Sequence, residues 1–400
     1  MNPADLFESP NPLARHYSRF RVGERLLLSG HSHQAWPDAA EAGQAQAFLD
    51  AAEHVDEKWS RAFERARRLK QALAGMLDDT GGTYALGTNT HELVTRWLSA
   101  LPLARRPRLV TTDGEFHTLR RQLARLEEEG VEVRRVPAQP AVGVAERLIA
   151  ALDDSTAAVL TSSVFFGSGQ IAPGLGEVLR ACQHRGAELL VDAYHSLGVV
   201  PLSLAAEGLE GAFVVGGGYK YLQQGEGNCF LRVPPGRDLR PVLTGWFAEF
   251  EALEAAPGAR QVAYGPGAAA FAGATYDPVS HYRAAAVLDF WEAQGLTPSL
   301  LREVSQHQVG LLAERFDALD LPPAAIDRDR TVRLSALGGF LALTTPNAAA
   351  LAEALKARGM LVDYRGEVLR LGPAPYLSDA QLETAAGLLG EAARDLEQAG

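Results

Sequence analysis

Short apolar runs alternate with helical patterns through the middle of the chain, and this alternation constrains the fold most strongly. Strand-like runs are expected at 83–86, 108–111, 131–133, 157–160 and 189–191, with helices at 91–101, 119–129, 143–152 and 174–185. Such alternation is typical of a parallel sheet covered by helices on both faces. A further run at 227–233 follows the run at 212–215 too closely for a helical crossover, so antiparallel pairing is expected there. The predicted fold class is α/β with a mainly parallel sheet.

The pattern differs at the two ends of the chain. The first forty residues are irregular, and one long helical region is predicted over 38–77. Beyond residue 282 the pattern predicts helices at 282–293 and 297–318, strands at 340–343, 361–364 and 368–371, and a final helix at 378–396. We therefore predict a large domain over 45–281 and a small α+β domain made of 1–44 and 282–400.

Composition excludes several classes of protein. The 400 residues are 47% hydrophobic and 22% charged, which is ordinary for a globular protein. A net charge of −11 without a strong basic cluster argues against a nucleic-acid partner. No membrane span and no signal peptide are expected. Two cysteines, Cys182 and Cys229, predict a reducing, cytoplasmic setting and are expected to be packing residues.

An acid and a lysine follow two of the strand-like runs. Asp192 follows the run at 189–191, and Lys220 follows the run at 212–215 and three glycines at 216–218. Ligands of open α/β sheets bind at the carboxyl ends of the strands. A pyridoxal phosphate (PLP) enzyme needs this pair, because the lysine forms a Schiff base and the carboxylate holds the ring nitrogen protonated. Each residue alone also has an ordinary interpretation, as a loop lysine and a capping aspartate. The spacing matches neither a Walker loop nor a dinucleotide fingerprint.

Other strand ends carry residues that suit the same ligand. Thr88, Asn89 and Thr90 open a helix, where amides and hydroxyls bind phosphate well. Asn89 with Glu92 also resembles a plain capping box. Phe116 can stack on a cofactor ring or be a core residue, and a polar segment lies at 162–170. The joint pattern predicts a site for an aromatic phosphate ester such as PLP.

Five motifs carry a resemblance to a known family. They read Asp-Ala-Tyr-His at 192–195, Gly-Tyr-Lys-Tyr-Leu at 218–222, Gly-Trp-Phe at 245–247, Asp-Tyr-Arg at 363–365 and Arg-Leu-Gly-Pro at 370–373. With them the chain resembles the fold-type-I PLP enzymes, specifically the class V aminotransferase group and, within it, the kynureninases. The resemblance extends from about Leu26 to the last helix.

The resemblance implies a role for each matching residue. Lys220 would bind the cofactor and move the substrate α-proton, Asp192 would pair with the ring nitrogen, and His195 would support the ring 3-oxygen or Asp192. The phosphate would be held by Thr88, Asn89, Thr90 and Tyr219, with Phe116 stacked on the ring. Trp246 and Thr275 would come from the neighbouring subunit, which implies a homodimer with its active sites at the subunit interface. Arg370 would clamp the substrate carboxylate, and the matching segment places His31 and Ser32 at the substrate pocket.

The chain departs from the kynureninase pattern on the substrate side. Ser-Gly-His-Ser-His-Gln at 29–34 stands where kynureninases have Asp-Gly-Asn-Ser-Leu-Gly. Phe116 is followed by His-Thr-Leu, so the aspartate of the family's Phe-Pro-Ser/Thr-Asp is missing, and Thr275 replaces an asparagine. The cofactor residues are kept while the substrate-side residues differ, which fits a divergent member.

The resulting functional hypothesis is a PLP-dependent hydrolase. It would cleave a C–C bond of kynurenine or a related amino acid to an anthranilate-type product and alanine, a reaction of tryptophan degradation, with Tyr219 as the general acid. The alternatives are a class V aminotransferase or a β-lyase. Cysteine desulfuration is the least expected, because it needs a nucleophilic cysteine on a mobile loop. Zinc binding by His31 and His33 is a weaker hypothesis, since their spacing is unspecific, and no metal is expected.

Overall fold

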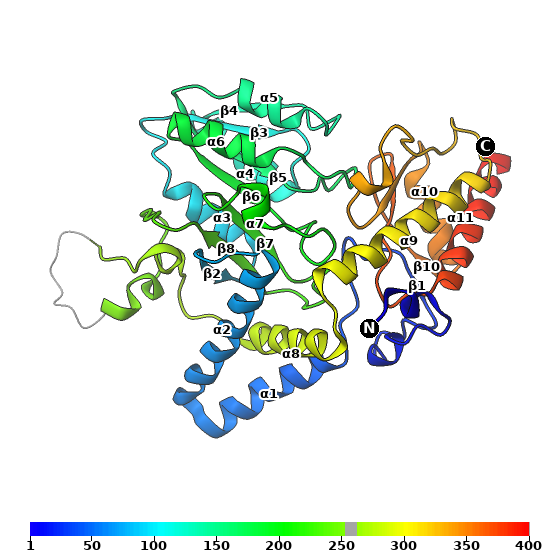
Figure 1. The fold of residues 1–400 in the computed structure, drawn as a ribbon, viewed down its shortest axis with the longest axis horizontal. Helices are drawn as coiled ribbons and strands as arrows, with labels where there is room; N and C mark the ends of the chain where they lie inside the picture. The colour runs from blue at the N-terminus through cyan, green and yellow to red at the C-terminus, as the bar shows by residue number, and fades with distance from the viewer. Residues whose placement is uncertain (253–261, 400) are drawn as a thin grey trace.

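The centre of the protein is a seven-stranded sheet (Figure 1). The structure is a computed structural model and describes residues 1–252 and 262–399. Along the chain the strands of this sheet are β2 (Thr83–Gly87), β3 (Arg108–Thr112), β4 (Glu132–Val136), β5 (Thr156–Ser162), β6 (Glu188–Asp192), β7 (Phe213–Gly217) and β8 (Cys229–Val233). Across the sheet they lie in the order β2-β8-β7-β6-β5-β3-β4. Strands β3 to β7 are parallel to one another, whereas β8 is antiparallel to both β7 and β2. The predicted α/β class is confirmed.

Helices cover both faces of this sheet. Successive side chains of a strand point to opposite faces. In β6, Leu190 packs in one cluster with α3 (Thr90–Ser99) and α4 (His117–Glu128), whereas Leu189 and Val191 pack in another with α5 (Val144–Ala150) and α6 (Leu175–Arg185). The short α7 (Leu204–Glu207) leads into β7. Because both faces are buried, a ligand reaches the sheet at the ends of its strands.

The helical region predicted over 38–77 is present but bends in the middle. The segment forms α1 (Ala39–His54) and α2 (Lys58–Met76), separated by a 3₁₀ turn at Val55–Glu57. Val55 has a φ of 48°, in the left-handed region that a β-branched residue rarely adopts. The bend lets both helices pack against α8 (Val279–Gln294), and it leaves Phe48 and Val55 exposed instead of on one buried stripe.

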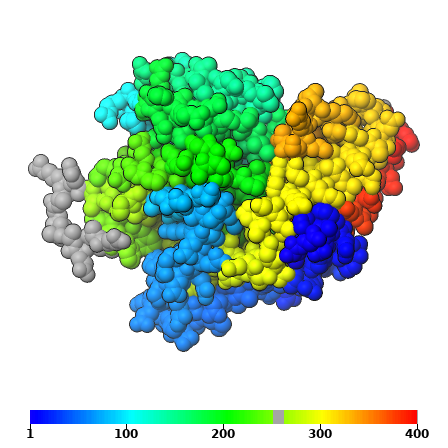
Figure 2. Space-filling view, in the orientation of Figure 1, coloured from blue at the N-terminus to red at the C-terminus, as the bar shows by residue number. Residues whose placement is uncertain are grey.

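The C-terminal part is a smaller α+β unit. A three-stranded antiparallel sheet has the order β11 (Asp363–Arg365), β12 (Val368–Leu371), β9 (Leu341–Thr344), and the helices are α9 (Pro298–Ala318), α10 (Ala348–Ala357) and α11 (Asp379–Ala399). The strand predicted at 361–364 is divided, since β10 (Met360–Leu361) instead pairs in parallel with β1 (Leu26–Leu27). The N-terminal segment, dark blue in Figure 2, thus lies against this unit. The domain boundaries remain a prediction.

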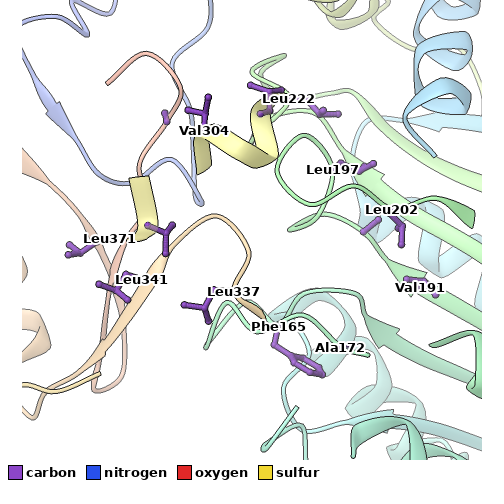
Figure 3. Packing of buried hydrophobic residues seen from close by; sticks show 14 of the residues in the cluster. Phe165, Ala172, Val191, Leu197, Leu202, Leu222, Val304, Leu337, Leu341 and Leu371 are labelled. Atoms are coloured by element: carbon purple, nitrogen blue, oxygen red, sulfur yellow. The ribbon is translucent and has the colours of Figure 1, made fainter. Parts of the chain in front are cut away.

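Apolar contacts join the C-terminal unit to the sheet region. Leu337 and Leu371 belong to the same buried cluster as Phe165 and Leu222, as Figure 3 shows. Backbone hydrogen bonds reinforce the contact, since the amide of Gly338 donates to the carbonyl oxygen of Gly169 at 2.7 Å. The segment that follows β5 is therefore fixed to the C-terminal unit.

No helix in the described ranges 1–252 and 262–399 combines the length and the apolar character needed to cross a membrane.

A buried ion pair ties the start of β2 to β8. Arg232 donates through Nε and Nη2 to the two carboxylate oxygens of Asp79 at 2.9 and 2.8 Å, and both side chains are almost fully buried. Burial favours the neutral acid, but the hydrogen bonds from Arg232 and Tyr84 hold the pKa of Asp79 well below its ordinary value. Such a pair is costly to break from one side, because the remaining charge stays buried.

We expect Arg232→Met to lower the free energy of unfolding by about 3–5 kcal/mol, because it leaves the Asp79 carboxylate buried without its partner. Urea unfolding followed by circular dichroism measures the change. The matched control is Arg19→Met, which breaks the exposed pair with Glu41 and is expected to leave the free energy of unfolding nearly unchanged. Equal losses in the two variants would contradict the interpretation.

Candidate active site

A cavity lies at the carboxyl ends of the central strands. It is lined, among others, by Thr90, Phe116, Ser162, Asp192, His195, Tyr219 and Lys220. Ser162 and Asp192 are paired residues at the ends of β5 and β6, and Lys220 follows β7. The structure therefore brings together residues that the sequence places at five separate strand ends.

Lys220 is the buried cation of this cavity, with only 5% of its surface exposed. Its Nζ contacts Nε2 of His195 and lies 4.8 Å from the ring centroid of Tyr194 and 5.2 Å from that of Phe116. Burial lowers its pKa to about 7; the charge of Asp192 opposes this shift and that of Arg370 adds to it. A large fraction of the amine is thus neutral at physiological pH and able to act as a nucleophile.

Asp192 and His195 are both buried but differ in what they contact. Oδ1 of Asp192 accepts a hydrogen bond from the Tyr194 amide at 2.8 Å. Burial raises the pKa of this carboxyl, against the effects of that amide and of Lys220. Burial and the nearby charge of Lys220 keep the pKa of His195 well below its ordinary value, so its ring is neutral. Among the described residues, His195 contacts Lys220 and makes no hydrogen bond to Asp192.

The N-terminus of α3 carries the residues expected to hold a phosphate. Asn89 is its N-cap, since Oδ1 accepts from the Glu92 amide at 2.8 Å. Thr88 donates its hydroxyl to Oε2 of Glu92 at 2.9 Å. The side chain of Asn89 therefore caps the helix, as the capping-box alternative predicts. Thr90 lines the Lys220 cavity, whereas Thr88 lines a separate open cleft of about 1180 Å³.

Trp246 and Thr275 do not line the cavity around Lys220 of their own chain. Thr275 lines the open cleft. Trp246 begins the 3₁₀ helix η4 (Trp246–Ala252), is 46% exposed, and stacks on Phe250 with ring centroids 5.4 Å apart. Their place in the fold is compatible with groups offered to a second subunit.

Arg370 on β12 is buried, with 3% of its surface exposed, so it is not a surface strand arginine. Its Nη1 donates to the carbonyl oxygen of Phe166 at 2.6 Å, and its Nη2 donates to the carboxylate of Asp363. Its Nε has no partner among the described residues. These two bonds use two of the five N–H groups of the guanidinium, so Nε and the second N–H of Nη2 are among those that remain for a ligand.

Neither His31 nor Arg370 is among the residues that line the Lys220 cavity, although Phe166, which Arg370 contacts, is. The side chain of His31 is fully buried, with Nε2 3.5 Å from Oδ2 of Asp363, and burial lowers its pKa to about 4. Ser32 is half-buried and hydrogen-bonded to His33, whose exposed ring stacks on Tyr219 with centroids 4.9 Å apart. His33 thus contacts Tyr219, which lines the cavity.

Two acids of the site were given no role by the sequence. Glu115 is buried beneath Ser162, and Asp363 holds Arg370. The one signal for Glu115 in the sequence is its position. It lies between a predicted strand and the aromatic residue that precedes the next helix. Asp363 belongs to the quoted Asp-Tyr-Arg motif, whose pairing with Arg370 becomes visible only in the register of β11 with β12.

The residues present fit PLP. Lys220 supplies an amine of lowered pKa, Asp192 a buried acid, and Phe116 and Tyr194 aromatic rings around the amine. A helix N-terminus at Thr90 suits the phosphate. Within the described ranges, no group of three or more His, Cys, Asp or Glu side chains could hold a metal ion.

The chain is similar in sequence to kynureninases. Residues 302–389 match the family model of the kynureninase C-terminal domain. Kynureninase of Burkholderia mallei (strain SAVP1) is 29% identical over 389 residues, covering 91% of this chain and 88% of its own. Kynureninase of Stenotrophomonas maltophilia (strain K279a) is 28% identical, with 88% and 87% covered.

Solved structures agree on the fold. The apo cysteine desulfurase of Thermococcus onnurineus NA1 has a TM-score of 0.77 at 16% identity and covers 96% of this chain and 98% of its own. The cystine C-S lyase C-DES, in complex with cysteine persulfide, has a TM-score of 0.77 at 16% identity, with 92% and 98% covered.

Fold and site together define a PLP-dependent enzyme of fold type I, with PLP as its cofactor. Within that class the chain is similar to kynureninases, both in its C-terminal domain and over most of its length.

We expect the rate at which the apo-enzyme takes up PLP to rise from about pH 6 to about pH 8 and then level off, because the unprotonated Lys220 amine attacks the aldehyde. The visible absorbance of the bound cofactor measures the rate. Lys220→Ala should abolish that band, and Lys356→Ala, at an exposed lysine of α10, should keep both band and profile. A rate still rising towards the ordinary lysine pKa would contradict the lowered pKa of Lys220.

Proposed function

We propose that the enzyme hydrolyses a C–C bond of kynurenine or a kynurenine-like amino acid, releasing alanine and an anthranilate-type acid in tryptophan degradation. The similarity to kynureninases over 91% of the chain supports this substrate class. The observation that carries the proposal is the position of Arg370. It lies inside the matched C-terminal domain and close enough to Lys220 for its charge to lower the pKa of that amine.

Arg370 would bind the substrate carboxylate. Its guanidinium is fixed by Asp363 and by the Phe166 carbonyl, and the open Nε can join Nη2 in a two-point contact. Preorganisation of this kind lowers the entropy lost when the substrate binds. The substrate α-carbon would then be held beside Lys220.

Two residues of the cavity would move protons. When bound, PLP supplies an electron sink for the bonding electrons at the substrate α-carbon. The neutral Lys220 amine can take the α-proton. Burial raises the pKa of Tyr219 to about 12, so its hydroxyl stays protonated and can donate to an oxygen of the substrate. Water adds its hydroxyl to the side-chain carbonyl carbon, and the released three-carbon unit gains a proton to become alanine.

A second candidate is transamination or β-elimination on another amino acid. Leu119 lines the cavity where the kynureninase pattern carries aspartate, which removes a charged group from the substrate side. Cysteine desulfuration has less support. Cys182 and Cys229 are buried in α6 and β8, and burial raises the pKa of both thiols to about 12.

We expect the holoenzyme to release anthranilate from kynurenine, or hydroxyanthranilate from 3-hydroxykynurenine, together with one equivalent of alanine. Fluorescence and amino-acid analysis measure the products, and Lys220→Ala is the inactive control. Pyridoxamine phosphate formed with a panel of other amino acids would instead support transamination. If neither acid forms from its substrate at any concentration, the proposed hydrolase activity is refuted.

We further propose that the active unit is a homodimer whose sites lie at the subunit interface. Trp246, Phe250 and Val242 are exposed apolar side chains around the cleft, and they would be covered by a second subunit. Thr275 and Trp246 of one subunit would then complete the cofactor site of the other.

Mixing inactive variants tests the shared site. Lys220→Ala and Trp246→Ala homodimers should each have low activity. A refolded equimolar mixture should recover about a quarter of the wild-type rate, since half the dimers would carry one site with both native residues. A mixture no more active than its components, or a monomer by light scattering, would rule out sharing.

A further inference from the structure

Glu115 lies at the point where the strand order of the large sheet reverses. Strand β3 has β4 on one side and β5 on the other, so the chain turns back across β3 after β4. Open α/β sheets bind ligands in the crevice at such a switch point. Glu115 follows β3 and is only 3% exposed, so a carboxyl group is buried at this crevice.

Three donors from the two flanking strands satisfy this carboxyl. Oε2 accepts the Ser162 hydroxyl at 2.6 Å, and Oε1 accepts the Thr112 hydroxyl at 2.6 Å and the Ser162 amide at 3.2 Å. The side chain thereby bridges the ends of β3 and β5. Ser162 lines the Lys220 cavity, whereas Glu115 lies outside its lining.

The Ser162 hydroxyl has a single proton, and its direction depends on Glu115. While Glu115 is a carboxylate, that proton is used in the hydrogen bond to Oε2, so Ser162 offers only lone pairs to the cavity. A protonated Glu115 becomes a donor to the Ser162 oxygen. The Ser162 proton is then free to point into the cavity, beside Asp192 and Lys220.

We propose that Glu115 is a positioning residue of the PLP site, whose protonation state sets whether the Ser162 hydroxyl donates a hydrogen bond into the cavity or accepts one. This role concerns the cofactor and holds whichever amino acid the enzyme uses. A carboxyl that merely braced two strand ends would have no such effect on a bound group.

The electrostatic surroundings suit a change near neutral pH. Burial raises the pKa of Glu115 to about 7, against the hydrogen bonds from Ser162 and Thr112. Asp192 is the charged group that acts on it from the neighbouring strand, and repulsion from that carboxylate raises the pKa further. Ser162 is therefore a donor to the cavity below this pKa and an acceptor above it.

The test compares Glu115→Gln and Ser162→Ala with the wild type. The pH dependence of the holoenzyme's visible spectrum and of the PLP dissociation constant is measured from about pH 6 to 8, the range around the pKa of a buried acid that titrates near neutrality. Asp50→Asn is the matched control, because Asp50 is also buried and accepts from two side chains, Gln46 and Tyr282, away from the cavity.

We expect the visible spectrum of the wild-type holoenzyme to show a transition near neutral pH that both variants lose, whereas the pH dependence of binding that comes from the Lys220 amine should remain in all of them. PLP should bind about three- to tenfold more weakly to Ser162→Ala, the effect of one hydrogen bond. Glu115→Gln should instead resemble the wild type at low pH, because its amide can donate to Ser162 as the protonated acid does. Asp50→Asn should keep the transition. Thermal unfolding of the apo-proteins separates folding from positioning, and Ser162→Ala leaves Glu115 in place if Glu115→Gln folds poorly.

Three outcomes would overturn the proposal. The first is a spectral transition of the wild type that persists in both variants. The second is the absence of any spectral transition in the wild type. The third is a Glu115→Gln variant that is less stable but shows the same spectral transition as the wild type. Kynurenine turnover is not measured, so failure of the proposed hydrolase activity leaves the result intact.

Discussion

The burial of the Lys220 amine at the edge of the sheet is the constraint on which the rest of the site depends. Desolvation makes the ammonium costly, so the amine is partly neutral at physiological pH. The backbone reaches this position only because small residues precede it. A side chain at Gly217 would lie 2.3 Å from the Tyr194 hydroxyl, and one at Gly218 would lie 2.6 Å from Gln224. The glycines thus allow the close approach that buries the lysine.

A cluster of charged groups surrounds Asp363 beside the Lys220 cavity. This carboxylate pairs with Arg370 and Arg365 and faces His31, and despite its burial these groups hold its pKa well below the ordinary value. Asp363 therefore stays ionised and fixes the guanidinium without needing a ligand. The charges of Asp363, Arg370 and Arg365 also act on Lys220, so this cluster and the reactive amine are electrostatically coupled.

Strand periodicity and strand-end chemistry were enough to predict the sheet and to bring Asp192, Lys220 and Phe116 to one cavity. Features that depend on tertiary packing were not predictable in the same way. The bend at Val55 places a β-branched residue in an unfavourable conformation, which only the packing of α1 and α2 on α8 explains. Glu115 was missed because one of its partners, Ser162, is 47 residues away in the sequence. The other, Thr112, is only three residues away and is an ordinary strand residue.

The pairing of β1 with β10 has a consequence for how the chain assembles during synthesis. Every strand of the large sheet lies between residues 83 and 233, so that sheet can form while later residues are still being added. Leu26, Leu27 and Ser29 find their partners only at residues 360–372. The segment around Leu26 is therefore made before the large sheet but fixed after it, and the Arg370 side of the site forms only once residues 360–372 have been made.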